Sequence, residues 1–300
     1  MLYTRRSKSR KFVLGNMSNK SKIEWTDSTW NPVTGCTKVS AGCKNCYAEQ
    51  VAKRFWKNRE FTEVLTHPER LDQPFHWKKP RRIFVNSMSD LFHESVPFEF
   101  IAEVFERMTW NFFKSCKKTD AECGCECIHD PDFFYPDGCK CWREILPHTY
   151  QILTKRPERM LEFFKSVKSV KEHKNVWLGV SCENQETADE RIPLLLQIPA
   201  AIRFISAEPL LQAVDISKYA KELDWCIVGG ESGFGARSFD LEWAESLRDQ
   251  CKTAGVPFFM KQFGSNPFLY PYDDLKLHNR KGNDWSEWPK DLRVREFPKC

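Results

Sequence analysis

Short apolar runs rich in β-branched and aromatic residues alternate along this chain with longer segments of helical periodicity. Runs of this length between polar turns are typical of parallel strands buried on both faces of a sheet. The alternation of strand and helix predicts an α/β fold with a parallel sheet. The expected strands lie near 25–33, 83–85, 150–153, 176–180, 202–205, 225–228 and 257–260, and the expected helices at 47–55, 98–112, 157–170, 187–197 and 241–254.

The spacing of the expected strands indicates how the sheet is organised. From residue 150 onward the strands begin every 23 to 32 residues, a repeat typical of a βα barrel or a doubly wound sheet. The interval between the strands that begin at 83 and 150 is 67 residues, which is too long for one repeat. Residues 114–146, which are rich in cysteine, are therefore expected to be an insert in a βα repeat.

Charge is distributed unevenly along the chain. The 300 residues include 46 Lys and Arg and 41 Asp and Glu, and seven of the basic residues, with no acid, fall within 1–22. We expect 1–20 to be a disordered basic tail, 21–265 to form the barrel domain with its insert, and 266–300 to be a C-terminal extension packed on the barrel. No apolar run reaches the roughly 18 residues of a membrane span and no secretory signal is visible, so we expect a cytoplasmic protein without membrane association.

Polar and charged side chains gather where the expected strands end. The carboxyl ends of parallel strands share one edge of a barrel or open sheet, and ligands bind at that edge. Because Ser, Asp and Asn also cap helices, a single cluster of this kind carries little weight. Six clusters at one edge predict a polar active site. They lie at 86–90, 154–157, 181–184, 206–209, 229–233 and 261–264.

Thirteen cysteines, an odd number, exclude complete disulfide pairing and suggest metal ligands in a reducing compartment. The first group is Cys36, Cys43 and Cys46, in one loop between the first expected strand and the helix at 47–55. Three thiolates in one loop suit an iron–sulfur cluster or zinc. Since a [4Fe-4S] cluster takes four ligands, three cysteines would leave one iron for a substrate or cofactor. The alternatives are a zinc site completed elsewhere and plain buried cysteines.

A second group of cysteines lies in the expected insert. Alternating cysteines place their thiols on one face of an extended segment, and two such segments can form a tetrahedral zinc site. The insert is too small for a substantial core, so a bound metal would largely hold it together. Structural zinc, a second iron–sulfur cluster, and disulfide or redox chemistry are the alternatives. The expected ligands are Cys123, Cys125, Cys127, Cys139 and Cys141.

The three-cysteine loop after the first strand of a βα barrel resembles that of the radical SAM superfamily. The usual spacing there is Cys-x3-Cys-x2-Cys, whereas the first interval here is six residues. The chain is more similar to a family of radical-SAM-like phage and prophage proteins often encoded beside a three-Cys-motif partner protein, and it is distantly similar to spore photoproduct lyase. The similarity covers 20–265 apart from the insert and is carried by 23–27, 30–36, 42–48, 86–92, 153–157, 179–181 and 229–233.

This resemblance implies a partial TIM-like (β/α) barrel of the radical SAM type with a small cysteine-rich insert. It implies an enzyme, either a lyase or a modification enzyme, in which Cys36, Cys43 and Cys46 hold a [4Fe-4S] cluster. An electron donor would drive cleavage of S-adenosyl-L-methionine to a 5′-deoxyadenosyl radical, which abstracts hydrogen from the substrate. A nucleotide or nucleic acid is the substrate class that it suggests, and the three-Cys-motif protein is the expected partner.

The resemblance and the strand positions together give the polar residues of this edge their expected roles. The methionine part of the cofactor has an amine and a carboxylate to be bound, and a planar guanidinium suits a carboxylate. For each residue the alternative is a helix cap or a salt bridge. We expect contacts to the methionine amine or a ribose hydroxyl from Asn86, Ser87 and Asp90, to the methionine carboxylate from Lys155 or Arg156, to the ribose from Ser181 and Glu183, and catalytic contacts to the substrate from Glu208, Glu231 and Lys261.

A second class of function is a zinc-dependent nucleic-acid-binding module without catalysis. This hypothesis predicts a colourless protein that holds zinc in both cysteine groups. A third hypothesis is an enzyme of the same barrel that acts on a small molecule or a partner protein. The crowded polar edge favours an enzyme over a binding module.

Overall fold

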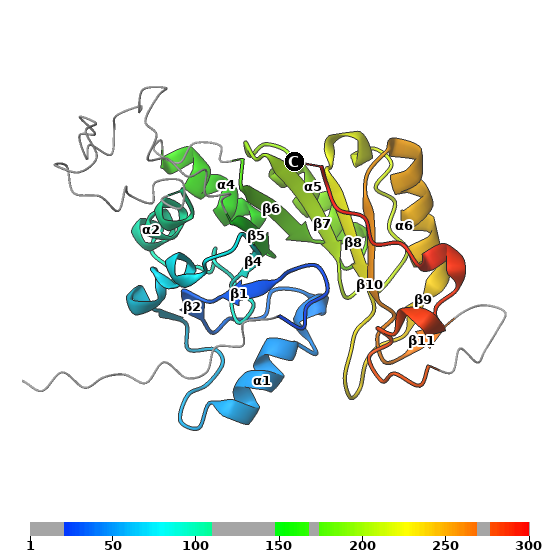
Figure 1. Cartoon of the computed structure of the whole chain (residues 1–300), viewed down its shortest axis with the longest axis horizontal. Helices are drawn as coiled ribbons and strands as arrows, with labels where there is room; N and C mark the ends of the chain where they lie inside the picture. The colour runs from blue at the N-terminus through cyan, green and yellow to red at the C-terminus, as the bar shows by residue number, and fades with distance from the viewer. Residues whose placement is uncertain (1–20, 110–147, 168–173, 269–276, 300) are drawn as a thin grey trace, which may run out of the picture.

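Seven parallel strands form one curled sheet in the computed structural model (Figure 1). The structure describes residues 21–109, 148–167, 174–268 and 277–299. The strands stand in chain order, so each pairs with the next and the sheet closes halfway into a barrel. They are β1 (Ser28–Trp30), β4 (Arg82–Val85), β5 (Thr149–Thr154), β6 (Val176–Ser181), β7 (Ile202–Ala207), β8 (Trp225–Gly229) and β10 (Phe258–Gln262). The predicted α/β fold with a parallel sheet is confirmed.

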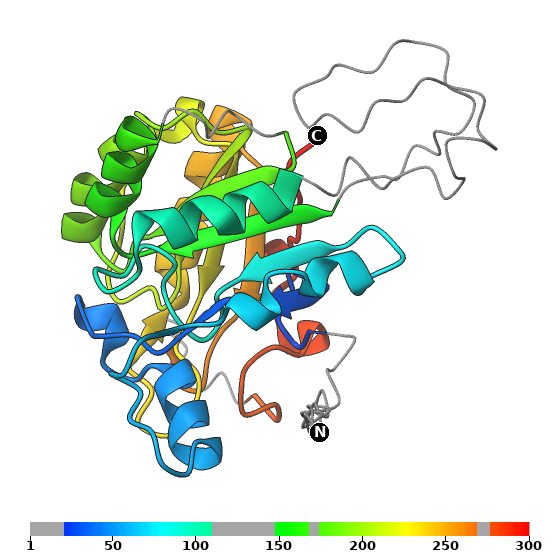
Figure 2. The same ribbon diagram turned by 90° about the vertical axis from the view of Figure 1, so that its left-hand side faces the viewer.

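Helices and short strand pairs surround this sheet. The helices are α1 (Tyr47–Phe55), α2 (Phe98–Thr109), α4 (Pro157–Ser166), α5 (Gln185–Leu195) and α6 (Leu241–Ala254). The additional strands are β2 (Val33–Thr34), which pairs antiparallel with β3 (Leu65–Thr66), and β9 (Phe239–Asp240), which pairs parallel with β11 (Pro267–Phe268). Single 3-10 turns lie at Ala41–Cys43, Pro68–Arg70, Gln73–His76, Ala220–Glu222, Trp285–Glu287 and Lys290–Leu292. Figures 1 and 2 show α2, α4, α5 and α6 along the outer side of the sheet, whereas α1 lies beyond the carboxyl ends of the strands.

Local sequence signals set the ends of the helices. The Asn184 side chain accepts the Thr187 N–H at 2.9 Å, and the Thr187 hydroxyl accepts the Asn184 N–H at 3.2 Å. This reciprocal cap satisfies two backbone donors and starts α5 at Gln185, two residues before the expected start. Gly255, with φ +74°, ends α6 in the left-handed conformation that glycine adopts without strain.

The strand expected near 25–33 is divided into two. Its first part, β1, joins the parallel sheet beside β4, and its second part, β2, leaves the sheet and pairs with β3. Pro32 lies between the two parts and has no N–H for a sheet ladder. The division turns the chain outward, toward the loop that carries the first cysteines.

The two faces of the sheet have different partners. Side chains alternate between faces along each strand, and the outer set packs against the helices in the larger core cluster. The inner set forms a second, aromatic cluster inside the curl of the sheet. Its buried members are Trp25, Phe84, Trp177, Ile202, Phe204, Trp225, Ile227 and Phe259. This cluster fills the amino-terminal part of the half-barrel and leaves the carboxyl edge for polar side chains.

The last described segment, 277–299, packs on the sheet. The Phe297 ring lies 5.3 Å from that of Trp225 and 5.2 Å from that of Phe259, and the Trp225 indole donates to the Glu296 carbonyl at 2.8 Å. Trp288 stacks on Phe263 with a centroid distance of 4.7 Å. The extension therefore covers the open side of the inner cluster near β8 and β10.

Some of the expected features lie outside the residues that the structure describes. The expected tail 1–20 and the insert 114–146, with Cys123, Cys125, Cys127, Cys139 and Cys141, lie outside the described residues. The same holds for the end of the helix expected at 98–112, which is described as far as Thr109. Within the described ranges, no helix has both the length and the apolar character needed to cross a membrane.

The inner face predicts a stability difference between two glycines. A Cβ on Gly179 of β6 would lie 2.5 Å from the ring of the fully buried Phe204, whereas a Cβ on Gly229 of β8 would meet its nearest atoms at 3.4 Å. Overpacking a core costs about 1–3 kcal/mol, so Gly179→Ala should lower the free energy of unfolding by that amount. Gly229→Ala should change it by less than about 1 kcal/mol. Urea unfolding followed by tryptophan fluorescence checks both, and equal decreases would contradict this packing.

Candidate functional site

The loop with Cys36, Cys43 and Cys46 crosses the carboxyl edge of the sheet between β2 and α1. Gly35, with φ +93°, starts it and has no room for a side chain, because a Cβ there would lie 2.2 Å from the Glu63 carbonyl oxygen. Cys46 is the N-cap residue of α1. All three cysteines are half-buried and none forms a disulfide. The loop thus brings three unpaired sulfurs to the edge at which ligands bind in parallel sheets.

Arg156, which follows β5, holds the first part of this loop. Its guanidinium donates to the Thr37 hydroxyl at 2.9 Å and to the Thr37 carbonyl at 3.1 Å, and it lies 3.6 Å from the Cys36 sulfur. Two carboxylates, Asp90 at 3.4 Å and Glu94 at 2.9 Å, balance its charge. Arg156 is only 5% exposed, so its cation is committed to the cysteine loop.

The Cys36 thiol is held in its neutral form by its surroundings. Burial raises its pKa to about 12, and the neighbouring Asp90 charge adds to this effect, although the Arg156 guanidinium opposes it. At neutral pH the metal-free side chain is therefore a thiol. A metal ion takes the thiolate, so binding at Cys36 would release a proton.

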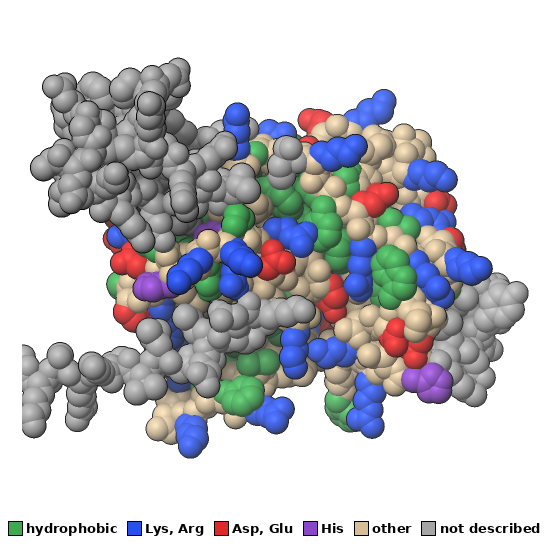
Figure 3. Space-filling view, viewed as in Figure 1, with side chains coloured by type: hydrophobic (Ala, Val, Ile, Leu, Met, Phe, Trp, Pro, Cys, Tyr) green, Lys and Arg blue, Asp and Glu red, His purple; other side chains and the backbone are tan. Residues whose placement is uncertain are grey.

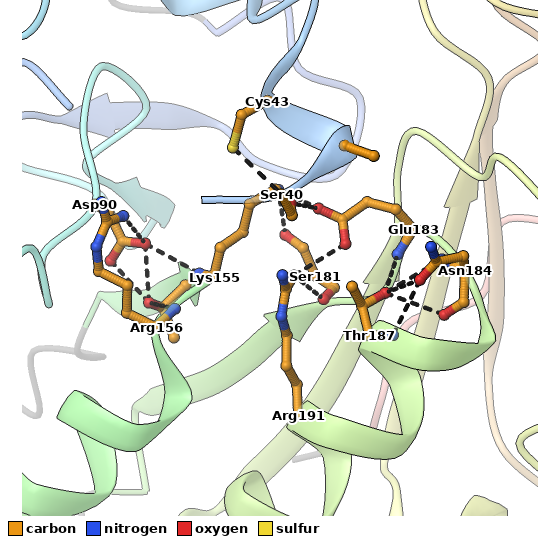
Figure 4. A network of polar contacts seen from close by, with 12 residues as sticks. Ser40, Cys43, Asp90, Lys155, Arg156, Ser181, Glu183, Asn184, Thr187 and Arg191 are labelled. Atoms are coloured by element: carbon orange, nitrogen blue, oxygen red, sulfur yellow. Dashed lines mark hydrogen bonds and ion pairs between the residues drawn. The ribbon is translucent and has the colours of Figure 1, made fainter. Parts of the chain in front are cut away.

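Glu183, which follows β6, holds the middle of the loop (Figure 4). The Ser40 hydroxyl donates to its carboxylate at 2.6 Å, and Arg191 of α5 donates to the other oxygen at 2.9 Å. Gly42 packs so closely that a Cβ there would lie 2.2 Å from this carboxylate. Glu183 is fully buried, which alone would raise its pKa, but the charges of Lys155 and Arg191 and the Ser40 hydroxyl bring the pKa below its usual value. The carboxylate is therefore ionised.

Glu231, which follows β8, holds the end of the loop. The Asn45 amide donates to its carboxylate at 2.8 Å, and Arg237 donates to the other oxygen at 2.6 Å. Arg237 also donates to the Ala41 carbonyl at 2.9 Å. Burial would raise the pKa of Glu231, but the hydrogen bonds from Arg237 and Asn45 outweigh it and lower the pKa. Side chains that follow β5, β6 and β8 thus contact the first part, the middle and the end of the cysteine loop.

Other predicted residues face the space beneath this loop. The Lys155 ammonium lies 2.8 Å from the Ser181 hydroxyl and 3.7 Å from Glu183 (Figure 4). Glu208 after β7 and Lys261 of β10 form an ion pair across β8. These side chains are the charged groups that a ligand at the carboxyl edge would meet first.

Tyr47, the first residue of α1, closes the site on the side of Ser87. Its hydroxyl donates to the Ser87 carbonyl, although half of the residue's surface is exposed. The pKa of Tyr47 lies well above its usual value because the hydroxyl is enclosed, and because the negative charges of Cys46 and Glu208 lie nearby. The hydroxyl therefore ties the start of α1 to the carboxyl end of β4.

Two buried polar atoms at this edge have no hydrogen-bond partner among the described residues. They are Nδ2 of Asn86 and Oγ of Ser206. Asn86 follows β4 with φ +63°, a conformation rare for residues other than glycine, and its Oδ1 accepts the Val33 N–H at 3.2 Å. Ser206 pairs in register with Ser181. Unsatisfied buried groups are costly in a native structure, so both are candidates to bind a polar ligand.

The donor set of the loop fits an iron–sulfur cluster in its chemistry. Three free thiols lie on one loop and the Arg156 guanidinium lies 3.6 Å from the Cys36 sulfur; cysteine thiolates with a hydrogen-bond donor nearby are the surroundings that such clusters take. Across the described ranges, no group of three or more His, Cys, Asp or Glu side chains has the spacing of a formed metal site. Cluster binding would therefore turn the cysteine side chains toward a common centre. The cysteines predicted as ligands in the insert lie outside the described residues.

The structure brings nearly all the predicted residues of the barrel to one place, but it gives three of them neighbours that the sequence did not indicate. Arg156, Glu183 and Glu231 contact the cysteine loop itself. Their predicted contacts to the methionine carboxylate, the ribose and the substrate stay predictions. Sequence reasoning missed their partners, because a single sequence does not show which side chains face one another, either across more than 100 residues or within one strand–helix turn. These are Thr37, Ser40, Asn45, Arg191 and Arg237.

These features define the chain as an α/β half-barrel with a cysteine loop fixed over its carboxyl edge. The family model of DUF5131, described as "Protein of unknown function", matches residues 20–115 and 131–289, so the chain belongs to the DUF5131 family. The matched residues include the cysteine loop, whereas Cys123, Cys125 and Cys127 fall in the unmatched segment 116–130. The searches of curated proteins and of solved structures gave no match.

The buried Glu183–Arg191 pair predicts a large and pH-dependent effect on stability. Removing one partner of a buried pair costs about 3–5 kcal/mol, so Glu183→Gln should lower the free energy of unfolding at pH 7 by that amount. Because the folded pKa of Glu183 lies below the ordinary value of 4.5, the pair stabilises above that pH and its contribution disappears as the pH falls further. Urea unfolding at several pH values should show the difference from wild type shrinking below about pH 4.5.

Glu186→Gln is the matched control for this experiment. Glu186 lies in the first turn of the same helix, α5, and is exposed. Its substitution should change the free energy of unfolding by less than about 1 kcal/mol at each of these pH values. Similar decreases for both variants would contradict the central role of Glu183.

Proposed function

We propose that the chain is a radical SAM enzyme in which Cys36, Cys43 and Cys46 hold a [4Fe-4S] cluster. The observation that carries this proposal is the position of a loop with three unpaired thiols at the carboxyl edge of a parallel half-barrel. Side chains from three strand ends fix the loop there. A catalytic cluster needs such support, because its donors must be held over a substrate that also contacts the barrel.

A cluster held by Cys36, Cys43 and Cys46 would supply, together with S-adenosyl-L-methionine and one electron from a donor, the cleavage chemistry that starts hydrogen abstraction from the substrate. The work of the chain is to bind the cofactor, orient the substrate and exclude water. The inner aromatic cluster fills the half-barrel below the site. The Tyr47 hydroxyl ties the start of α1 to Ser87 beside the cysteine loop.

Lys155 is the cation best placed for the methionine carboxylate. Arg156, the other candidate, already contacts Asp90, Glu94 and Thr37. The Lys155 ammonium touches the Ser181 hydroxyl and is 3.7 Å from Glu183, whose charge is also balanced by Arg191. A carboxylate that enters the site can therefore take a charge-assisted hydrogen bond from Lys155.

The remaining polar groups suit the other parts of a bound ligand. The unpartnered Asn86 amide and Ser206 hydroxyl offer a donor and a donor–acceptor at the same edge. The Glu208–Lys261 pair stands at the ends of β7 and β10, on either side of β8, and can bind or protonate a polar substrate group. Glu231 acts on the reaction indirectly in this proposal, by holding Asn45 and the loop.

The proposal also sets requirements outside the chain. Radical formation consumes an electron, so an electron donor must bind or diffuse to the site. Unpaired thiols and an oxygen-sensitive cluster suit the reducing cytoplasm. A three-Cys-motif protein as partner, a nucleotide or nucleic acid as substrate, and zinc or a second cluster at the insert cysteines are parts of the same proposal.

Metal analysis of anaerobically purified protein tests the proposal. Wild-type protein should be brown, contain about four irons and four sulfides at the loop, and form 5′-deoxyadenosine from S-adenosyl-L-methionine after reduction. The Cys36→Ser/Cys43→Ser/Cys46→Ser variant should lose this iron and all cleavage, because its loop has no thiolate ligands. Optical spectra, iron and sulfide assays and chromatography of the products give the readouts.

Cys251→Ala is the matched control, since Cys251 is a buried cysteine of α6 far from the loop. It should keep the loop iron and the cleavage activity. A colourless wild-type protein that holds only zinc after cluster reconstitution would overturn the proposal and favour a zinc-dependent binding module. An iron content in the triple variant equal to that of wild type would place the cluster elsewhere and overturn the assignment to this loop.

The position of Lys155 predicts a separate effect on cofactor binding. A hydrogen bond to a charged group is worth about 1.5–3 kcal/mol, so Lys155→Met should raise the KM for S-adenosyl-L-methionine about tenfold or more. Lys155→Arg, which keeps the charge, should recover part of this affinity. Iron content should equal that of wild type in both variants. An unchanged KM, or loss of iron in Lys155→Met, would contradict this role.

A further inference from the structure

Helix α1 presents an apolar stripe to solvent. Tyr47, Val51 and Phe55 recur every fourth residue and are 50%, 39% and 65% exposed. Residues spaced by four lie on one face of a helix, and here the buried face belongs to Ala48 and Ala52 instead. A helix normally turns its large apolar side chains inward. The exposed stripe therefore has the character of a contact surface.

Basic side chains are interleaved with this stripe. Segment 36–58 contains a single acid, Glu49, which bridges Lys38 at 3.0 Å and Lys53 at 2.8 Å. The Arg54 guanidinium lies over the Phe55 ring at 5.3 Å. The basic residues of the segment are Lys38, Lys44, Lys53, Arg54 and Lys57. The segment is thus strongly positive, although the chain beyond its basic N-terminal segment is close to neutral.

The loop after β8 extends this surface. Phe234 at its tip is fully exposed. The loop touches the start of α1, since the Asn45 amide donates to the Gly235 carbonyl at 3.0 Å and a Cβ on Gly233 would lie 3.6 Å from Gln50 Oε1. Figure 3 shows hydrophobic and basic side chains interspersed along the lower edge of the molecule, over α1 and this loop. We call these residues, Tyr47, Val51, Phe55 and Phe234 with the basic residues of 36–58, the α1 surface.

The composition of the α1 surface favours one class of binding partner over others. The core of a protein–protein interface is contiguous, apolar and depleted of lysine. Here the Arg54 guanidinium lies over the Phe55 ring and four lysines share the same segment, so a protein partner would have to bury several cations. A single strand of nucleic acid offers planar bases that stack on exposed rings and phosphates that pair with the cations between them. A duplex keeps its bases stacked inside and offers the phosphates alone.

We infer that the α1 surface is a docking site for single-stranded nucleic acid. Its position connects it with the candidate active site, because α1 directly follows Cys46 and the Tyr47 hydroxyl donates to the Ser87 carbonyl at the carboxyl edge. A strand bound along α1 ends at the mouth of that site. That the bound strand is also the substrate rests on the proposed function, whereas docking itself does not.

Fluorescence anisotropy with the full chain and a labelled oligothymidylate of about 20 nucleotides tests the inference. Stacking contributes a factor of about ten in affinity for each base, so Phe55→Ala/Phe234→Ala should raise the Kd about tenfold or more. Lys53→Glu/Lys57→Glu should raise the Kd as well and should reduce the slope of log Kd against log salt by about 0.7 for each phosphate that the variant no longer neutralises. Unlabelled oligouridylate and oligothymidylate as competitors identify RNA or DNA as the preferred strand.

A matched control lies at the amino end of the sheet, away from α1. Lys221→Glu/Lys252→Glu makes the same charge change just before β8 and near the end of α6. It should bind like wild type. Residues 1–20 add basic charge to every protein compared, so differences between variants report the α1 surface. No binding, equal weakening in the control, or equal competition by duplex would overturn the inference.

Two further outcomes separate this inference from its alternatives. A dimer in sedimentation that Phe55→Ala/Phe234→Ala dissociates would show that the α1 surface joins two copies of the chain, which overturns the inference. The binding assay needs neither iron nor S-adenosyl-L-methionine. A failure to bind nucleic acid therefore leaves the proposed function standing, and a failure of radical chemistry leaves the docking site standing.

Discussion

The arrangement of the site depends on one buried carboxylate, that of Glu183. Withdrawing a carboxylate from water costs several kcal/mol, which its partners must offset. Arg191 from α5 offsets it on one side and the Ser40 hydroxyl of the cysteine loop on the other. Gly42 lets the loop backbone approach to a distance that any side chain would prevent. The loop is thus part of the stabilisation of a buried charge, and leaving the sheet would remove the hydrogen bond that Ser40 donates to it.

This constraint divides the strand-end residues into two groups. Arg156, Glu183 and Glu231 are each saturated by contacts to the loop or to their own counter-charges, so they position other groups. Lys155 and the Glu208–Lys261 pair have simpler surroundings and face the space that a ligand would occupy. A catalytic edge needs both kinds of residue, because a reactive centre loses most of its advantage when its support can move. Position in the sequence does not separate the groups, since both follow strands in the same way.

Much of the fold could be predicted from the sequence, because parallel strands buried on both faces leave apolar runs that few other structures produce. The carboxyl edge and the cysteine loop followed from strand order alone. The break at Pro32 between β1 and β2 was visible as a proline but not as a change of partner strand. The direction of each strand-end side chain could not be predicted: Ser40 and Glu183 are 143 residues apart, and only the folded sheet brings them together. In the same way, the near-neutral charge of the chain beyond its basic N-terminal segment concealed a local excess of cations in 36–58, since net charge carries no information about position.

Helix α1 joins the two surfaces that the structure distinguishes. Its first residues belong to the site, where Cys46 precedes the helix and Tyr47 covers the edge, and its outward face carries Val51 and Phe55. The helix has only nine residues and directly follows Cys46, so a ligand bound to its exposed face lies within one short helix of the cysteine loop. Asn45 strengthens this link, because the same amide holds both Glu231 and the loop that bears Phe234. A polymer that binds the α1 surface therefore contacts the same short segment that carries the cysteines. Docking and chemistry both depend on how the sheet holds that segment.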